Sequence, residues 1–99
     1  MIGPPPPPPP TPPQPRTVLI VEDEAALRRV LERALTRAGY RVLGASSAET
    51  AYELLASEHA DAVLLDVQLP TMSGLALYLA LVHRHPALAG RIAIMSGDA

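Results

Sequence analysis

The chain has 99 residues, of which 48% are hydrophobic and 18% are charged, and its formal net charge is −2. These values are typical of one small globular domain. No basic cluster supports nucleic-acid binding, and no apolar run is long enough to span a membrane. The absence of cysteine excludes disulfides and thiolate metal sites. Because no secretory signal precedes the domain, we expect a cytoplasmic protein with no nucleic-acid or membrane partner.

Residues 1–16 differ in composition from the rest of the chain. Ten of residues 4 to 15 are proline, including the unbroken run from Pro4 to Pro10. Such a segment adopts an extended polyproline helix without internal hydrogen bonds. It can serve as a stiff spacer, or it can be a ligand for a proline-recognising module, since Pro12 and Pro15 have PxxP spacing before Arg16. We favour the spacer and place the folded domain at residues 17–99.

Beyond residue 16 the hydrophobic pattern alternates between that of strands and that of helices. The predicted strands are residues 17–21, 41–45, 61–66 and 91–95. The predicted helices are residues 24–38, 46–59 and 74–85, and Gly39 and Pro86 end the first and the last of them. The order βαβαβαβ requires crossover connections and a parallel sheet. The fold class is therefore α/β.

Helical spacing also predicts which side chains are buried. Ser46 and Glu49 have the spacing of a capping box, which places the start of the second helix at Ser46. The expected core positions of the first helix are Leu27, Val30, Leu31, Ala34, Leu35 and Ala38. The expected core positions of the third helix are Leu75, Tyr78, Leu79 and Val82.

Three carboxylates follow two of the predicted strands. Residues 17–21 run directly into Glu22 and Asp23, and residues 61–65 run directly into Asp66. In an open α/β sheet, ligands bind at the carboxyl ends of the strands. Three clustered negative charges require a cation or raised pKa values, and Mg²⁺ prefers such oxygen ligands. Taken alone, Glu22 and Asp23 fit an ordinary helix N-terminus equally well.

Three segments together resemble the receiver domain of two-component response regulators. They are residues 18–24 (VLIVEDE), residues 62–74 (AVLLDVQLPTMSG) and residues 94–98 (IMSGD). An acid pair, an acid followed by a Leu-Pro-x-Met-x-Gly loop and a later hydroxyl residue fall in the order that this family has. The resemblance implies a flavodoxin-like, CheY-like fold. The proline-rich start and the tail look similar to receivers attached to hybrid sensor histidine kinases.

The resemblance implies a role for each residue of the site. Asp66 would accept a phosphoryl group from a histidine kinase or a histidine phosphotransfer protein. The metal would be Mg²⁺, bound by Asp23 and Asp66, by Glu22 through water, and by the backbone carbonyl of Gln68. Ser96 would be the switch hydroxyl that hydrogen-bonds the phosphoryl group. Any enzymatic activity would be at most Mg²⁺-dependent self-phosphorylation from a phosphohistidine or a small phosphodonor.

The chain departs from the family after its fourth strand. A complete receiver continues with a fifth strand that carries a lysine for the phosphate, whereas this chain contains no lysine. We therefore expect a truncated receiver with slower phosphorylation or a shorter-lived product. The alternative is a phosphorylation-independent binding module or an inactive fragment. Loss of the fifth strand also makes residues 91–95 an exposed edge, through which we expect a homodimer.

Overall fold

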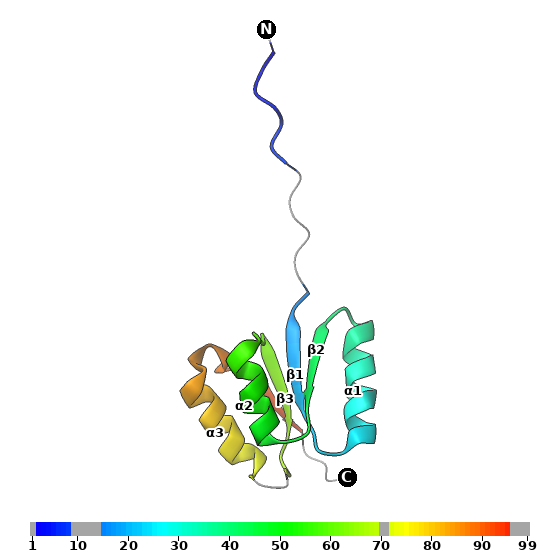
Figure 1. Cartoon of the computed structure of the whole chain (residues 1–99), viewed down its shortest axis with the longest axis vertical. Coiled ribbons are helices and arrows are strands. Elements are labelled where there is room, and N and C mark those ends of the chain that lie inside the picture. The colour runs from blue at the N-terminus through cyan, green and yellow to red at the C-terminus, as the bar shows by residue number, and fades with distance from the viewer. Residues whose placement is uncertain (1, 9–14, 70–71, 96–99) are drawn as a thin grey trace.

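Four parallel strands form one sheet in the order β2-β1-β3-β4, as the computed structural model of the chain shows (Figure 1). The structure describes residues 2–8, 15–69 and 72–95. The strands are β1 (Thr17–Val21), β2 (Arg41–Ala45), β3 (Ala62–Asp66) and β4 (Ile92–Met95). The helices are α1 (Ala25–Arg37), α2 (Ala48–Ser57) and α3 (Gly74–Arg84), followed by the short 3₁₀ helix η1 (Pro86–Leu88). The predicted α/β class and element order are confirmed, with boundaries shifted by a few residues at most.

Strand β1 lies in the middle of the sheet, between β2 and β3. All five of its residues are buried. Its register pairs Val21 with Ala45 on one side and with Leu65 on the other. A parallel strand covered on both faces is expected to be a continuous apolar run, which is what the sequence of β1 shows. This placement brings the carboxyl ends of β1 and β3 side by side.

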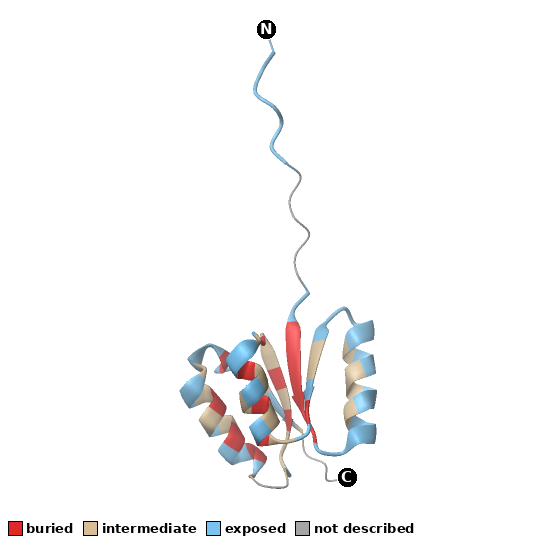
Figure 2. Ribbon diagram, in the orientation of Figure 1, coloured by how far each residue is buried: buried red, intermediate tan, exposed pale blue. Residues whose placement is uncertain are grey.

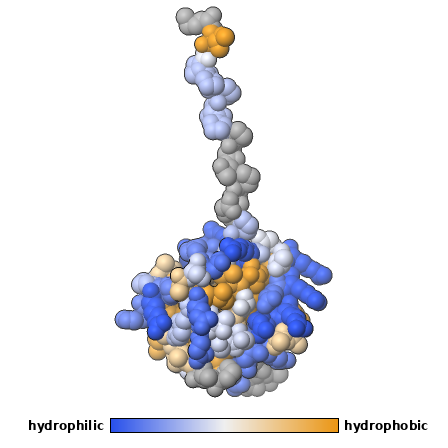
Figure 3. Space-filling model, in the orientation of Figure 1, coloured by the Kyte–Doolittle hydropathy of each residue, from blue (hydrophilic) through white to orange (hydrophobic). Residues whose placement is uncertain are grey.

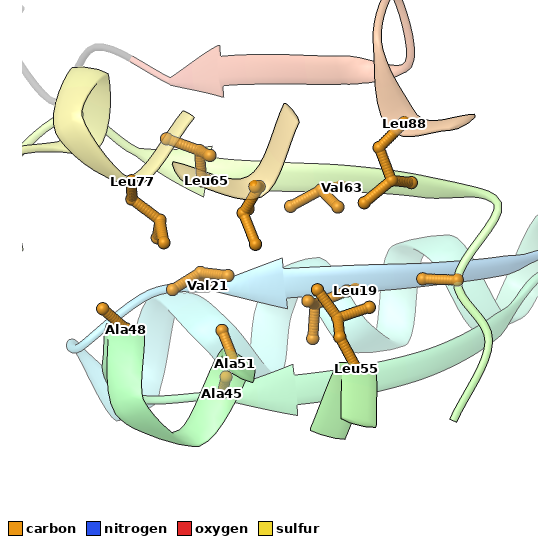
Figure 4. Close-up of a cluster of buried hydrophobic side chains, with 12 residues drawn as sticks. Leu19, Val21, Ala45, Ala48, Ala51, Leu55, Val63, Leu65, Leu77 and Leu88 are labelled. Carbon is orange, nitrogen blue, oxygen red and sulfur yellow. The ribbon is translucent and has the colours of Figure 1, made fainter. Parts of the chain in front are cut away.

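The main hydrophobic core lies between the sheet and the helices α2 and α3 (Figure 4). The strands contribute Leu19, Val21, Val63 and Leu65, which alternate with residues of the opposite face. Helices α2 and α3 cover them with the side chains of Ala48, Ala51, Leu55, Leu77 and Leu81. Leu88 of η1 closes the core at its far end.

Helix α1 covers the opposite face of the sheet and has no buried residue (Figure 2). Leu31 and Leu35 are half-buried, whereas Val30 is 61% exposed. The prediction that all six apolar positions of this helix belong to the core is therefore wrong. Within the described part of the chain no second helix packs beside α1 on this face, so its apolar stripe is only partly covered. A groove of about 350 Å³ is left along the sheet, and its lining includes Leu35 and Tyr40.

The predicted core stripe of α3 is wrong at Leu75 and Leu79, whereas Tyr78 is half-buried and packs against the core. Gly74, Leu77 and Leu81 are the buried residues of this helix, while Leu75 and Leu79 are exposed, Leu79 by 61%. Both stripes have helical spacing, because apolar residues occupy nearly every side of α3. Which stripe faces the core depends on how the chain enters the helix at Gly74. Hydrophobic spacing carries no information about that entry.

The cap of α2 lies one residue later than predicted. Ser47 is the N-cap, and its side-chain oxygen accepts a hydrogen bond from the Thr50 backbone N–H at 3.2 Å. The capping box on Ser46 is thus incorrect, since the first helical residue is Ala48. Gly39 follows α1 with φ of 99°, which confirms the predicted left-handed helix end.

Residues 2–8, the first described part of the N-terminal segment, lie apart from the sheet and its helices, whereas the Arg16 carbonyl accepts from the Arg41 N–H of β2 at 2.9 Å. Residues 2–8 are exposed and carry no regular hydrogen-bonded structure, in keeping with a proline-rich composition (Figure 1). The boundary at residue 16 stays a prediction. Among the described residues, no helix combines the length and the apolar character needed to cross a membrane.

Candidate functional site

The acidic residues meet at one edge of the sheet because β1 and β3 are adjacent. The register pairs Val21 with Leu65, so the next residues along the two strands, Glu22 and Asp66, lie beside each other. The Glu22 backbone N–H donates to the Ala45 carbonyl at 2.9 Å, which extends the pairing of β1 with β2 up to the site. The fold thus places the three predicted acids at the carboxyl ends of parallel strands, where α/β proteins bind their ligands.

The carboxylates of Glu22, Asp23 and Asp66 form a compact cluster. One oxygen from each lies within 4.8 Å of the other two. Glu22 is only 2% exposed, Asp66 is half-buried and Asp23 is exposed, so the cluster is closed at its base and open to solvent at its mouth. It borders a hollow of about 700 Å³, whose lining residues are Glu22, Asp23, Glu24, Leu27, Asp66, Gln68 and Leu69.

Glu22 is the buried member of the cluster, and its charged form is unfavourable there. Its burial, followed by the contact with the Asp66 carboxyl, raises the pKa of Glu22 to about 7. Oxygen Oε1 accepts from the Glu24 backbone N–H at 3.2 Å, but the buried Oε2 has no hydrogen-bond partner within the described structure. A buried carboxylate oxygen without a partner is costly. A bound hard cation would neutralise the cluster, and a water on that cation could donate to this oxygen, so these residues fit a Mg²⁺ ion.

Backbone contacts fix the position of Asp66 at the end of β3. Its oxygen Oδ1 accepts from the Gln68 backbone N–H at 3.0 Å. Helix α3 starts directly behind it, because the Gly74 N–H donates to the Val67 carbonyl at 2.8 Å. A Cβ atom at position 74 would collide with the Asp66 carbonyl oxygen and the Val67 Cα. Glycine is therefore required where the loop returns past the acid.

The loop between β3 and α3 lies partly outside the described residues. Gln68 lines the hollow and forms an isolated antiparallel bridge with Ser73. Ser73 then caps α3 by accepting from the Ala76 N–H at 3.1 Å. The role of the Gln68 carbonyl as a metal ligand stays a prediction. Ser96, predicted to be the switch hydroxyl, lies outside the described residues.

Sequence reasoning missed two contacts around the site. Leu27 of α1 forms part of the wall of the hollow, although helical spacing assigned it to the core. Arg28 donates from Nη1 to the Glu22 carbonyl oxygen at 2.8 Å. Neither contact has a local sequence signal, because both depend on how α1 packs against the end of β1. The three acids themselves were predicted from their positions after strands.

Comparison with known proteins identifies the class of this domain. Residues 18–99 match the response regulator receiver domain family. The fold also superposes on the response regulator TrrA of Thermotoga maritima, solved in complex with Mg²⁺-BeF, with a TM-score of 0.77 and 26% identity. That superposition covers 85% of this chain and 71% of TrrA. The chain belongs to the receiver domain family, with a CheY-like fold of four described parallel strands.

Two further relatives indicate the range of proteins that carry such a domain. A sensor protein from Polaromonas is 32% identical with a TM-score of 0.77, over 88% of this chain and 69% of that one. A probable transcriptional regulator of Porphyra purpurea, ycf27, is 44% identical over 57 residues, which are 58% of this chain and 24% of that protein. The chain therefore matches about a quarter of that curated relative and about two thirds of the solved receivers. It is a receiver domain of the kind found in two-component signalling.

Proposed function

We propose that this receiver accepts a phosphoryl group on Asp66 from a phosphohistidine of a histidine kinase or a histidine phosphotransfer protein. The observation that carries the proposal is the compact cluster of Glu22, Asp23 and Asp66, with its buried and unpartnered Glu22 oxygen, in a member of the receiver family. Phosphoryl transfer requires the protein mainly to position the reacting groups and to stabilise their charge. A carboxylate cluster that binds a cation can do both.

Mg²⁺ is the cofactor of the proposed reaction. Asp23 and Asp66 would hold it directly, together with Glu22 through water and the Gln68 carbonyl. When bound, the ion would neutralise the cluster and the charge on the transferred phosphoryl oxygens. The relative TrrA, crystallised with Mg²⁺-BeF, supports this assignment. The buried Glu22 oxygen without a hydrogen-bond partner, beside two further carboxylates, supports it too.

The chemical step belongs to Asp66. The Gln68 N–H donates to Oδ1, and we assign Oδ2, which receives no such backbone hydrogen bond among the described contacts, as the atom that attacks phosphorus. The new bond joins Oδ2 to phosphorus while the bond between phosphorus and the histidine nitrogen breaks, and its electron pair stays on the imidazole. Ser96 would donate its hydroxyl proton in a hydrogen bond to a phosphoryl oxygen. Because residues 1–99 contain no lysine, no lysine ammonium from them can pair with the phosphate, and we expect a slow reaction or a short-lived product.

Intact-mass measurement after incubation with acetyl phosphate tests this function. The wild-type chain should gain one phosphoryl group only when Mg²⁺ is present, and Asp66→Asn should gain none. Asp61→Asn is the matched control, since it removes an acid of the same strand region that lies at the opposite end of β3. No adduct on a folded wild-type chain would contradict the proposal and favour a phosphorylation-independent binding module.

The setting of the domain is also part of the proposal. The match to a sensor protein fits a receiver attached to a hybrid sensor kinase, with residues 1–16 as the spacer. We place the domain in the cytoplasm, where the kinases that supply phosphohistidine act.

A further inference from the structure

Arg28 lies on the first turns of α1, directly behind the acidic loop. Its Nη1 donates to the Glu22 carbonyl oxygen at 2.8 Å. Its backbone N–H donates to the Glu24 carbonyl at 2.9 Å, as part of the first turn of α1. Arg28 thus contacts the backbone on both sides of Asp23, the exposed acid of the cluster. The Glu22 carbonyl is part of the peptide bond that joins Glu22 to Asp23. Fixing this group therefore limits where the Asp23 carboxylate can lie.

The other backbone group of Glu22, its N–H, is fixed by the sheet. The Glu22 N–H donates to the Ala45 carbonyl of β2 at 2.9 Å. Glu22 is therefore held through its N–H by β2 and through its carbonyl by Arg28. Within the described contacts, the Arg28 guanidinium is the side chain of α1 that makes the second of these two hydrogen bonds. Loss of the hydrogen bond from Arg28 to the Glu22 carbonyl would leave the backbone less restrained where the chain turns from β1 toward α1.

A second acid fixes the arginine itself. Glu32, one turn further along α1, has Oε1 at 3.6 Å from Arg28 Nε. Glu32 lies flat against β2 at Gly44, where an added Cβ would collide with its Oε1 and stand 3.5 Å from Arg28 Cδ. Glycine at position 44 thus leaves the space in which the Glu32–Arg28 pair lies. The Arg28 side chain is only 21% exposed, so the pair is partly shielded from water.

We infer that Arg28 is the positioning residue of the acidic loop: through the Glu22 carbonyl it holds Glu22 and Asp23 in the arrangement that binds Mg²⁺. The inference rests on the proposed function and adds a residue to it. Arg28 does not contact the phosphoryl group or the ion. It acts by ordering the loop before the cation arrives, which lowers the entropy lost on binding. A charged donor on a carbonyl is among the stronger hydrogen bonds available for this purpose.

Calorimetric titration with Mg²⁺ tests the inference. Arg28→Gln should raise the dissociation constant for Mg²⁺ about fivefold, because it loses a charged hydrogen bond. Arg28→Lys retains a charged donor and should restore part of the affinity. Arg29→Gln is the matched control: it removes the same charge from the neighbouring exposed position and should leave the affinity within about twofold of wild type. Equal loss in Arg28→Gln and Arg29→Gln would overturn the inference, since the loss would then not depend on the hydrogen bond to the Glu22 carbonyl. General electrostatics alone would tighten Mg²⁺ binding in both variants, because each loses a positive charge near the acidic cluster.

Amide hydrogen exchange of the metal-free proteins provides a second readout. In Arg28→Gln the amides of Asp23 and Glu24 should exchange faster, while those of Leu19 and Ile20 in the buried strand keep wild-type protection. Unchanged exchange at Asp23 and Glu24 would overturn the inference. If Arg28→Gln does not fold, Glu32→Gln replaces it, because it releases the guanidinium without removing it and should give a smaller shift in the same direction. If the wild-type chain binds no Mg²⁺, the proposed function itself is contradicted. This outcome is read from the wild-type chain alone, so it is distinct from any difference between the variants.

Discussion

Single residues at the two ends of the strands have opposite electrostatic roles. At the carboxyl ends, Glu22 is buried among acids and its pKa is raised to about 7. At the start of β1, Asp61 accepts from the Thr17 N–H at 2.7 Å and lies 3.0 Å from His59, and these contacts lower its pKa. The charged form of Asp61 is thus stabilised by its contacts. The charged form of Glu22 is destabilised, and a bound cation would stabilise it.

The lowered pKa of Asp61 predicts a pH-dependent stability. A carboxyl whose folded pKa lies below its unfolded value contributes stability above the unfolded pKa, and this contribution is lost as the pH falls through the folded pKa. Asp61→Asn should therefore melt at a lower temperature than wild type at pH 7, with the difference shrinking below about pH 3.8. Glu58→Gln, which removes the Arg41 partner, is the control and should show a smaller effect. A difference that grows toward low pH would contradict this role.

Two glycines provide a test of how the loop is packed around Asp66. Gly74→Ala places a methyl group against backbone atoms of Asp66 and Val67, which cannot rotate away. Gly44→Ala meets the end of the Glu32 side chain, which can move. Urea denaturation should show a loss of about 1–3 kcal/mol or more for Gly74→Ala and a clearly smaller loss for Gly44→Ala. Equal losses would show that the loop does not pass so close to α3.

At the scale of elements, the hydrophobic pattern predicted the kind and order of the four described strands and of helices α1, α2 and α3, but not the short 3₁₀ helix η1. The run in β1 is apolar because this strand is buried on both faces, whereas β3 is buried on one face and half-buried on the other. The acids after the two strands identified the site edge. The pattern failed where a helix is apolar on several sides, as in α3, or where its covering partner does not lie within the described residues, as in α1. Arg28 could not be predicted, because its contact depends on tertiary packing rather than on spacing.

The corrected face of α3 predicts a sharp contrast between neighbouring leucines. Leu81→Ala removes a fully buried side chain from the core and should cost about 2–5 kcal/mol of unfolding free energy. Leu79→Ala removes a side chain that is 61% exposed and should cost less than about 1 kcal/mol. Chemical denaturation of the two variants measures the difference. A larger loss for Leu79→Ala would restore the stripe that helical spacing first predicted.

For the whole molecule, the uncovered parts of the sheet are the main feature of the surface. Among the described residues, strand β4 is at one edge of the sheet, and Ile94 is 43% exposed. Apolar side chains also gather on the face seen in Figure 3, below the N-terminal segment and bordered by hydrophilic ones, on the side of the sheet away from β4 (Figure 1). An edge strand with free backbone groups and exposed apolar side chains favours pairing with another chain.

Sedimentation measurements over a range of concentrations test association through this edge. We expect the average mass of the wild-type chain to rise toward that of a dimer, and Ile94→Lys to shift the equilibrium toward monomer, because it places a charge on the edge. Ile2→Lys is the control, since Ile2 is exposed and lies outside the sheet. A mass that stays monomeric at all concentrations would exclude the dimer.

The central claim concerns one carboxylate among several, so the most direct measurement locates the phosphoryl group. Trypsin cleaves only after arginine here, which separates peptide 17–28, carrying Glu22 and Asp23, from peptide 42–84, carrying Asp61 and Asp66. The labelled chain is reduced with borohydride, which converts an aspartyl phosphate to homoserine, and is then digested and sequenced by tandem mass spectrometry. We predict homoserine at Asp66 alone, and only after labelling in Mg²⁺. Modification in peptide 17–28, or at Asp61, would contradict the assignment of Asp66 as the phosphoryl acceptor.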